Sequence, residues 1–150
     1  MLAELMREFH AEANYTIEQE RAAEAFLSLL NRPELGAVWI ALLGEASVGY
    51  VVLTLRYSMD HGGPVGRIED FYVRATSRRR GAGSALLSEL FEECRRQHYG
   101  AVDVEVDGRN ETATNLYRRF GLDEYRDGRV LLHVSITPPS PTSPCRGGEG

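Results

Sequence analysis

The feature that most constrains the fold is a strand–loop–helix–strand pattern between residues 65 and 107. "VGRIEDFYV" (65–73) predicts a strand that runs into a loop with three consecutive arginines, and residues 82–98 predict a long helix. "AVDVEVD" (101–107) alternates apolar and acidic residues, which predicts a second strand. A strand, a helix and a strand in this order indicate a parallel unit. We therefore expect a mixed α/β domain.

Two helices are predicted before the first strand. Apolar residues recur at helical spacing over residues 2–12, which indicates an amphipathic helix. Thr16 followed by Gln19 predicts a capping box that opens a second helix, and Pro33 is expected to stop that helix.

Before and after the parallel unit, the sequence predicts strands that pair in antiparallel fashion. The remaining elements are strands at 37–43 and 47–57 joined by a short turn, a turn at 61–64, a helix at 111–119, and a closing hairpin over 122–136 around Asp127-Gly128. The sheet is therefore expected to be antiparallel at first and parallel only in the 65–107 unit.

The chain length and the last residues define the expected domain. A chain of 150 residues suits one domain with a sizeable core, which we assign to residues 1–136. Residues 137–150 hold four of the six prolines and almost nothing apolar. Such a segment cannot offset its ordering entropy, so we expect a disordered tail.

Charge and composition exclude several classes of function. The net charge of −5 disfavours general binding to nucleic acid, which only the arginine run would support. No apolar run approaches the roughly 20 residues that a membrane span needs. Two cysteines and four scattered histidines show no metal-ligand spacing and no disulfide framework. We expect no metal and no membrane partner, and a reducing, cytoplasmic setting.

The loop before the long helix is suited to an anion. Gly81 and Gly83 let backbone N–H groups converge at a helix N-terminus, which favours a phosphate or a pyrophosphate. A P-loop is excluded because the sequence contains no lysine, and the GxGxxG fingerprint of dinucleotide-binding proteins is absent here. The alternative is a glycine turn with solvated arginines.

Three motifs together resemble the GCN5-related N-acetyltransferases (the GNAT family). Arg78-Arg79-Arg80-Gly81-Ala82-Gly83 fits the pattern Gln/Arg-x-x-Gly-x-Gly/Ala of that family's coenzyme A pyrophosphate loop. The strand "IEDFYV" enters this loop, and "NETATNLYRRFGL" (110–122) is similar to the family's second signature, with Leu122 in place of an aromatic residue. The resemblance covers about residues 5–136 and is nearest to the spermidine/spermine N-acetyltransferase branch.

The resemblance implies a fold and an assembly. The fold is a GNAT-type mixed, mostly antiparallel, twisted sheet flanked by helices. The family normally opens with a strand, whereas only Met1 precedes the first helix here, so the first strand is apparently missing. The family is often dimeric, which makes a homodimer possible for this chain.

The resemblance also implies a binding site for acetyl-CoA as co-substrate. Backbone groups of Phe71, Tyr72 and Val73 would line the pantetheine arm, and Asn110 would bind a pantetheine amide unless it only caps the following helix. The remaining residues assigned to acetyl-CoA lie in the loop and in the two helix starts: Arg78, Arg79, Arg80, Gly81, Ala82, Gly83, Ser84, Thr112, Ala113 and Tyr117. Not all three arginines can reach one pyrophosphate.

Proton transfer needs a base and an acid. A lysine-like amine with a pKa of about 10.4 arrives protonated, so a nearby carboxylate must accept its proton. Strand alternation places Glu69 with Phe71 on one face and Asp70 on the other. The resemblance implies that Glu69 is the base and that Tyr117 is the acid for the leaving thiolate.

Each assignment has an alternative. Glu69 would otherwise pair with Arg67 or Arg74 on a solvated face, and Tyr117 would otherwise be a helix aromatic that packs with Leu116 and Phe120. Asp70 and Glu105 are further candidates for the acidic side of the amine site, although Glu105 also fits the polar face of a strand.

The expected activity is direct acetyl transfer from acetyl-CoA to a primary amine of a small molecule, polyamine-like or amino-acid-like. No covalent enzyme intermediate is expected because neither cysteine lies in the site segments. The alternatives are acetylation of a protein lysine or α-amine, and a catalytically silent CoA-binding regulatory domain.

Overall fold

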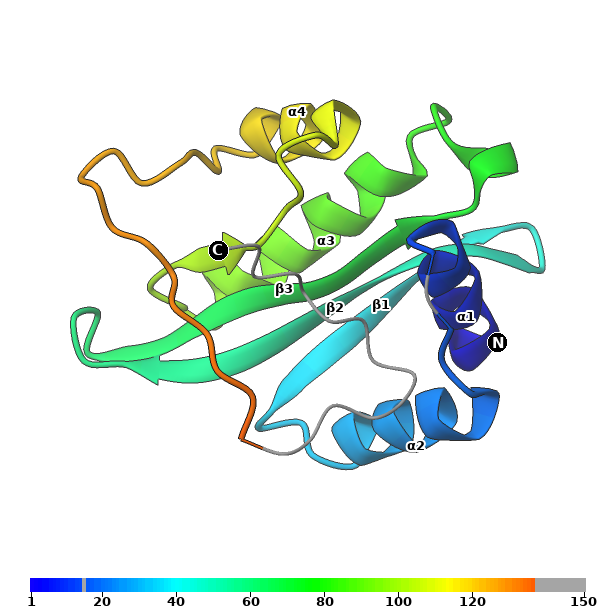
Figure 1. Cartoon of the computed structure of the whole chain (residues 1–150), viewed down its shortest axis with the longest axis horizontal. Coiled ribbons are helices and arrows are strands. Elements are labelled where there is room, and N and C mark those ends of the chain that lie inside the picture. Colours follow the sequence, from blue (N-terminus) through cyan, green and yellow to red (C-terminus); the bar gives the residue numbers. More distant parts are fainter. Residues whose placement is uncertain (15, 137–150) are drawn as a thin grey trace.

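The computed structural model describes residues 1–14 and 16–136. The tail predicted at 137–150 lies outside these residues. The fold is a four-stranded sheet with helices on both faces (Figure 1). The elements, in chain order, are α1 (Leu2–Glu12), α2 (Gln19–Leu30), β1 (Gly36–Leu43), β2 (Ala46–Ser58), β3 (Gly63–Val73), the short 3-10 helix η1 (Ala75–Ser77), α3 (Ala82–Arg96), β4 (Val102–Val104) and α4 (Glu111–Arg119).

The sheet has the order β1-β2-β3-β4, with one parallel pair. β1 with β2 and β2 with β3 are antiparallel, and β3 with β4 is parallel. The expected mixed, mostly antiparallel sheet is therefore confirmed. Within the described residues no strand precedes α1, so β1 forms one edge of the sheet.

Alternation along β2 divides the core into two layers. Val51 and Leu53 pack in a cluster with the buried face of α3 and with Tyr117 of α4. Tyr50 and Val52 pack on the other face with α1 and α2. The sheet therefore separates α1 and α2 from α3 and α4, and a side chain's position along a strand decides which pair of helices it faces.

β3 contains one more residue than its partner requires. The register pairs Asp70 with Val52 and Ile68 with Leu53, so Glu69 has no partner on β2 and forms a β-bulge. Ile68 and Phe71 consequently both pack on the α3 side. The expected alternation, with Glu69 facing the same side as Phe71, is therefore wrong.

The second helix begins without the predicted capping box. α2 starts at Gln19, and its N-cap position is Glu18, which makes no side-chain capping bond. Thr16 lies before this position, so its hydroxyl is not the cap. The helix ends at Leu30, before Pro33, as expected.

The closing hairpin over 122–136 is absent. These residues form neither helix nor strand, and their large apolar side chains between Val130 and Ile136 are 67–89% exposed. An isolated hairpin is only marginally stable in water and needs a sheet to extend. β4, the strand at the edge of the sheet, pairs over only three residues and so offers a short edge for a hairpin to extend. This strand had been expected over 101–107, and it covers only Val102–Val104.

No helix in the described part of the chain combines the length and the apolar character that crossing a bilayer requires.

Candidate active site

The bulge coincides with the place where β3 and β4 part. β4 pairs only with Gly66–Ile68, whereas β3 runs on to Val73 beside β2. Residues 69–73, which we name the open edge, therefore have no strand on their β4 side within the described chain. Unpaired backbone groups on a strand edge can bind an extended ligand that carries amide groups. Phe71, Tyr72 and Val73 lie on this edge, and the expected contact of their backbone groups with pantetheine stays a prediction.

The loop after β3 turns sharply into α3. Arg79 has a φ of 62° and Gly81 has a φ of 85°, both in the left-handed region. Gly81 is the N-cap of α3, and no side chain caps the first turn. The N–H groups of Ala82, Gly83 and Ser84 are therefore free for an anion or for water. We name residues 78–81 the arginine–glycine loop.

The three arginines of this loop have different surroundings. The Arg78 guanidinium donates from Nε to the Val73 carbonyl at 2.7 Å and from Nη2 to Glu12 at 2.5 Å. Arg79 and Arg80 are exposed, and neither forms an ion pair within residues 1–14 and 16–136. The positive charge available for phosphate therefore comes from Arg79 and Arg80, and Arg78 is already bound to the protein.

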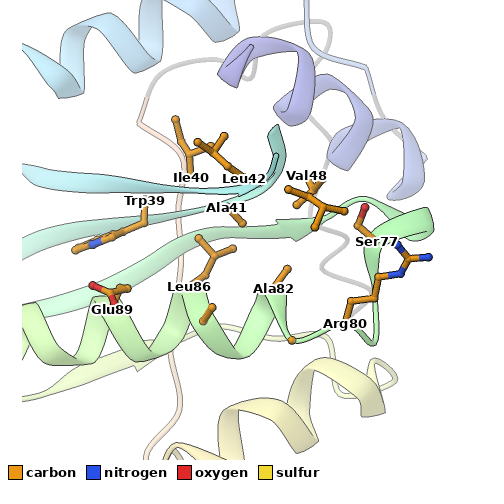
Figure 2. Close-up of a pocket in the computed structure, with 13 residues that line it drawn as sticks. Trp39, Ile40, Ala41, Leu42, Val48, Ser77, Arg80, Ala82, Leu86 and Glu89 are labelled. Carbon is orange, nitrogen blue, oxygen red and sulfur yellow. The ribbon is translucent and has the colours of Figure 1, made fainter. Parts of the chain in front are cut away.

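Figure 2 shows a cavity of about 410 Å³ between the β1 edge and α3. Its walls are apolar side chains such as Trp39 and Leu86, with Arg80 and Ser77 at one end. α4 contributes nothing to it, and none of the expected catalytic residues lines it. Three lining residues, Arg80, Gly81 and Ala82, were expected to bind acetyl-CoA, whereas the sequence did not predict the apolar wall that β1 contributes at the sheet edge.

Glu69 and Asp70 lie on the same face of the sheet because of the bulge. Thr54 Oγ1 donates to Glu69 Oε1 at 2.8 Å, and Tyr50 Oη donates to Asp70 Oδ2 at 3.1 Å. Thr54 and Tyr50 share one side of β2, the side covered by α1 and α2. Two carboxylates therefore stand next to each other at the open edge.

Neither carboxylate is neutralised by an arginine. The expected alternative partners of Glu69 bind elsewhere: Arg67 pairs with Asp103 at 2.6 Å, and Arg74 pairs with Glu8 at 2.8 Å. Glu69 forms no ion pair with any residue that the structure describes. The alternative in which Glu69 only pairs with one of these two arginines is therefore wrong.

Burial raises the pKa of Asp70, the Tyr50 hydrogen bond lowers it in part, and the neighbouring charge of Glu69 raises it again. A carboxylate with a raised pKa is a better proton acceptor at neutral pH than an ordinary one. Asp70 is thus a stronger candidate for acid–base chemistry than the sequence alone suggested.

Tyr117 lies on the opposite face, against the open edge. Its side chain is only 6% exposed, and its ring is 5.8 Å from that of Phe71. Burial raises its pKa, so the phenol keeps its proton at neutral pH. A Cβ on Gly83 would lie 3.1 Å from Phe71 and 3.3 Å from Leu116, so the start of α3 also approaches this point closely. The packing interpretation of Tyr117 is correct, and its role as an acid stays a prediction.

The start of α4 is capped by Asn110. Its Oδ1 accepts a hydrogen bond from the Ala113 N–H at 3.1 Å, so the capping interpretation is confirmed. The capping bond uses only the oxygen of the side chain, and the expected contact of its NH₂ group with pantetheine stays a prediction. Thr112 is exposed in the same turn, and Ala113 packs against the core.

Glu105 follows β4 directly, and its side chain is exposed. Its neighbour Asp103 is bound by both Arg67 and Arg56, at 2.6 and 3.3 Å, and so is not open to a cationic ligand. Among the described residues, no group of three or more His, Cys, Asp or Glu side chains could hold a metal ion.

Comparison with known proteins identifies this architecture. The model of the acetyltransferase (GNAT) family matches residues 2–122. An integron cassette protein, HFX_CASS3, from the mobile metagenome of Cole Harbour Salt Marsh is 38% identical, with a TM-score of 0.82 over 92% of this chain and 84% of that one.

Two more distant structures share the fold. An aminoglycoside acetyltransferase, meta-AAC0020, from an uncultured soil metagenomic sample, solved with sisomicin, is 21% identical with a TM-score of 0.73, over 91% of this chain and 86% of that one. A ribosomal-protein-alanine N-acetyltransferase from Brucella melitensis biovar Abortus 2308 is 18% identical with a TM-score of 0.69, over 88% and 91%. The chain belongs to the acetyltransferase (GNAT) family.

The raised pKa of Asp70 predicts a pH-dependent stability. The folded protein binds this proton more tightly than the unfolded chain, whose value is near 3.8. The resulting stabilisation is full below that value and is lost as the pH rises through the folded-state pKa. In Asp70→Asn, which keeps an oxygen for the Tyr50 hydroxyl, the free energy of unfolding should fall less between about pH 4 and pH 7 than in the parent.

Urea unfolding, followed by circular dichroism at several pH values, measures this difference. Glu89→Gln, on the exposed side of α3, is the matched control and should keep the parental pH dependence. Equal slopes for Asp70→Asn and the parent would show that Asp70 ionises as it does in the unfolded chain.

Proposed function

We propose that this member of the acetyltransferase (GNAT) family transfers an acetyl group from acetyl-CoA directly to a primary amine of a small, polyamine-like or amino-acid-like molecule. The observation that carries the proposal is the bulge at Glu69. It brings two carboxylates to one face, beside the part of β3 that β4 leaves unpaired, while Tyr117 lies on the other. A proton acceptor and a proton donor therefore flank the same stretch of backbone.

The residues present fit acetyl-CoA. The open edge offers backbone groups of Phe71 and Tyr72 to the amides of pantetheine, with the Asn110 side-chain NH₂ as a further donor. The uncapped first turn of α3, together with Arg79 and Arg80, suits the pyrophosphate. The Val73 carbonyl already accepts from Arg78, so its part in binding is smaller than expected. Bound acetyl-CoA supplies the thioester whose acetyl group is transferred.

Glu69 accepts the proton of the incoming ammonium, directly or through water, because it is the exposed carboxylate of the pair. Asp70, half-buried and held by the Tyr50 hydroxyl, adds negative charge behind it. Two adjacent carboxylates attract a cationic amine and hold it at the open edge. Asp70 is the second candidate for the base.

Tyr117 donates its proton to the departing thiolate. Its burial keeps the phenol protonated, and its packing against Phe71 holds the ring at the open edge. The amine adds to the thioester carbonyl carbon after its proton passes to a carboxylate, and the C–S bond then breaks as Tyr117 protonates the thiolate from the opposite face of β3.

A protein lysine or α-amine is the alternative acceptor, and a catalytically silent CoA-binding domain is the alternative outside catalysis. The carboxylate pair favours the enzyme over the silent domain, because a domain that only binds the donor has no need of a proton acceptor at the open edge. The acidic site consists of two adjacent carboxylates, which favours a small amine as the acceptor.

Thiol release from acetyl-CoA tests the proposal with a panel of polyamines, amino acids, aminoglycosides and a lysine peptide. We expect release above a no-acceptor blank with one class of small amine. Release with the peptide alone would contradict the small-molecule assignment. Binding of acetyl-CoA in calorimetry without release for any acceptor would favour the silent domain, and absence of binding would contradict the site itself.

Replacing Glu69 tests the base. Glu69→Gln keeps an oxygen for the Thr54 hydroxyl but cannot accept a proton, so kcat should fall by about 100-fold or more at neutral pH. Activity should recover in part at high pH, where the amine loses its proton unaided. Asp70→Asn serves as the comparison in the same pH–rate series. If Asp70→Asn shows the larger loss and Glu69→Gln keeps the parental profile, then Asp70 is the base.

Replacing Tyr117 tests the acid. Tyr117→Phe keeps the ring packing against Phe71, so the Kd for acetyl-CoA should stay near the parental value while kcat falls by about 100-fold. Tyr125→Phe, at a phenol that is 63% exposed, is the matched control and should behave like the parent. Unchanged turnover in Tyr117→Phe would remove this residue from the mechanism.

A further inference from the structure

A row of carboxylates on α1 faces a row of arginines after β3. Glu4, Glu8 and Glu12 recur every four residues, and Arg74 and Arg78 share the same spacing. Arg74 binds both oxygens of Glu8 at 2.8 Å and lies 3.8 Å from Glu4. Arg78 binds Glu12 at 2.5 Å. Helix α1 is thus attached to the chain that leaves β3 at two successive points.

The Glu12 contact differs from the others because it reaches two parts of the acetyl-CoA site. Glu12 Oε2 accepts from Arg78, the first residue of the arginine–glycine loop. Glu12 Oε1 accepts from the Tyr72 hydroxyl at 3.0 Å, and Tyr72 lies on the open edge. The Arg78 guanidinium also lies 5.7 Å from the centre of the Tyr72 ring. One carboxylate therefore connects the loop, the open edge and α1.

The geometry leaves Arg78 little freedom to bind a phosphate. Its Nε is used by the Val73 carbonyl and its Nη2 by Glu12, so a pyrophosphate would have to displace contacts of 2.7 and 2.5 Å. These same contacts hold the loop at its first residue, just before the left-handed Arg79 and Gly81. Arg78 therefore shapes the loop from inside the protein.

We propose that Glu12 is a positioning residue for acetyl-CoA. Through Arg78 and Tyr72 it orders the arginine–glycine loop before the donor arrives, and it connects the loop to the helix that covers the carboxylate face. This inference rests on the proposed function, since it concerns the same donor site. Side chains that are ordered beforehand do not have to be immobilised on binding, so the donor binds more tightly.

The effect belongs to binding and not to global stability. Glu12 and Arg78 are 45% and 43% exposed, and ion pairs that are this open to water contribute little to the free energy of unfolding. A purely structural role would lower the melting temperature and leave donor affinity unchanged. A positioning role would weaken donor binding and leave the melting temperature unchanged. Measuring both quantities therefore distinguishes the two roles.

Glu12→Gln tests the proposal in the full-length protein. We expect the Kd for acetyl-CoA in calorimetry to rise about threefold to tenfold, as for a side chain that must be ordered on binding, with kcat at saturating donor near the parental value. Glu4→Gln, whose carboxylate lies at the far end of the row and 3.8 Å from Arg74, is the matched control. It should keep the parental Kd, and both variants should keep the parental melting temperature.

The double variant Glu12→Gln/Arg78→Gln distinguishes positioning from direct binding. If Arg78 acts through Glu12, the double variant binds acetyl-CoA no more weakly than Arg78→Gln alone. Losses that multiply would show that Arg78 binds the pyrophosphate itself, and a parental Kd for Glu12→Gln would also overturn the inference. Failure of the unsubstituted protein to bind acetyl-CoA would overturn the proposed function as well, whereas the other outcomes would leave it intact.

Discussion

Glu69, which has no partner on β2, determines the face of the sheet toward which its neighbours on β3 point. A strand that is hydrogen-bonded to both neighbours along its whole length has no backbone groups left for a ligand. The extra residue in β3 reverses the side-chain alternation at the point where β4 departs. The bulge at Glu69 therefore gathers carboxylates on one face and directs Phe71 to the other, beside backbone that β4 leaves unpaired.

The two faces of the sheet carry different parts of the chemistry. The α1 and α2 side holds Glu69 and Asp70 with their hydroxyl partners, and the α3 and α4 side holds the buried Tyr117. The family assignment accounts for the fold and for the class of reaction, and the proposed base and acid lie on opposite faces. The apolar cavity beside β1 is lined by α3 and by Arg80 and Gly81, so it adjoins the arginine–glycine loop.

Local periodicity predicted most of the elements, because the spacing of apolar residues is a property of each segment alone. It could not predict the bulge, which depends on the register of β3 against β2 and is invisible in the sequence "IEDFYV". The Arg78–Glu12 pair joins residues 66 positions apart, so no short motif contains it. The hairpin predicted at Asp127-Gly128 is absent for the opposite reason. Its local pattern favours a hairpin, but β4 is too short an edge for the hairpin to extend. The roles of the site residues remain predictions.

The arginines that bind α1 also affect whether the enzyme can acetylate its own side chains. An acetyltransferase holds an activated acetyl group beside its own surface, and a lysine amine there would compete with the substrate. Every cationic side chain among the 17 Lys and Arg positions of this sequence is an arginine. A guanidinium stays protonated at any physiological pH and is a poor nucleophile. The arginines that bind α1 are thus resistant to self-acetylation.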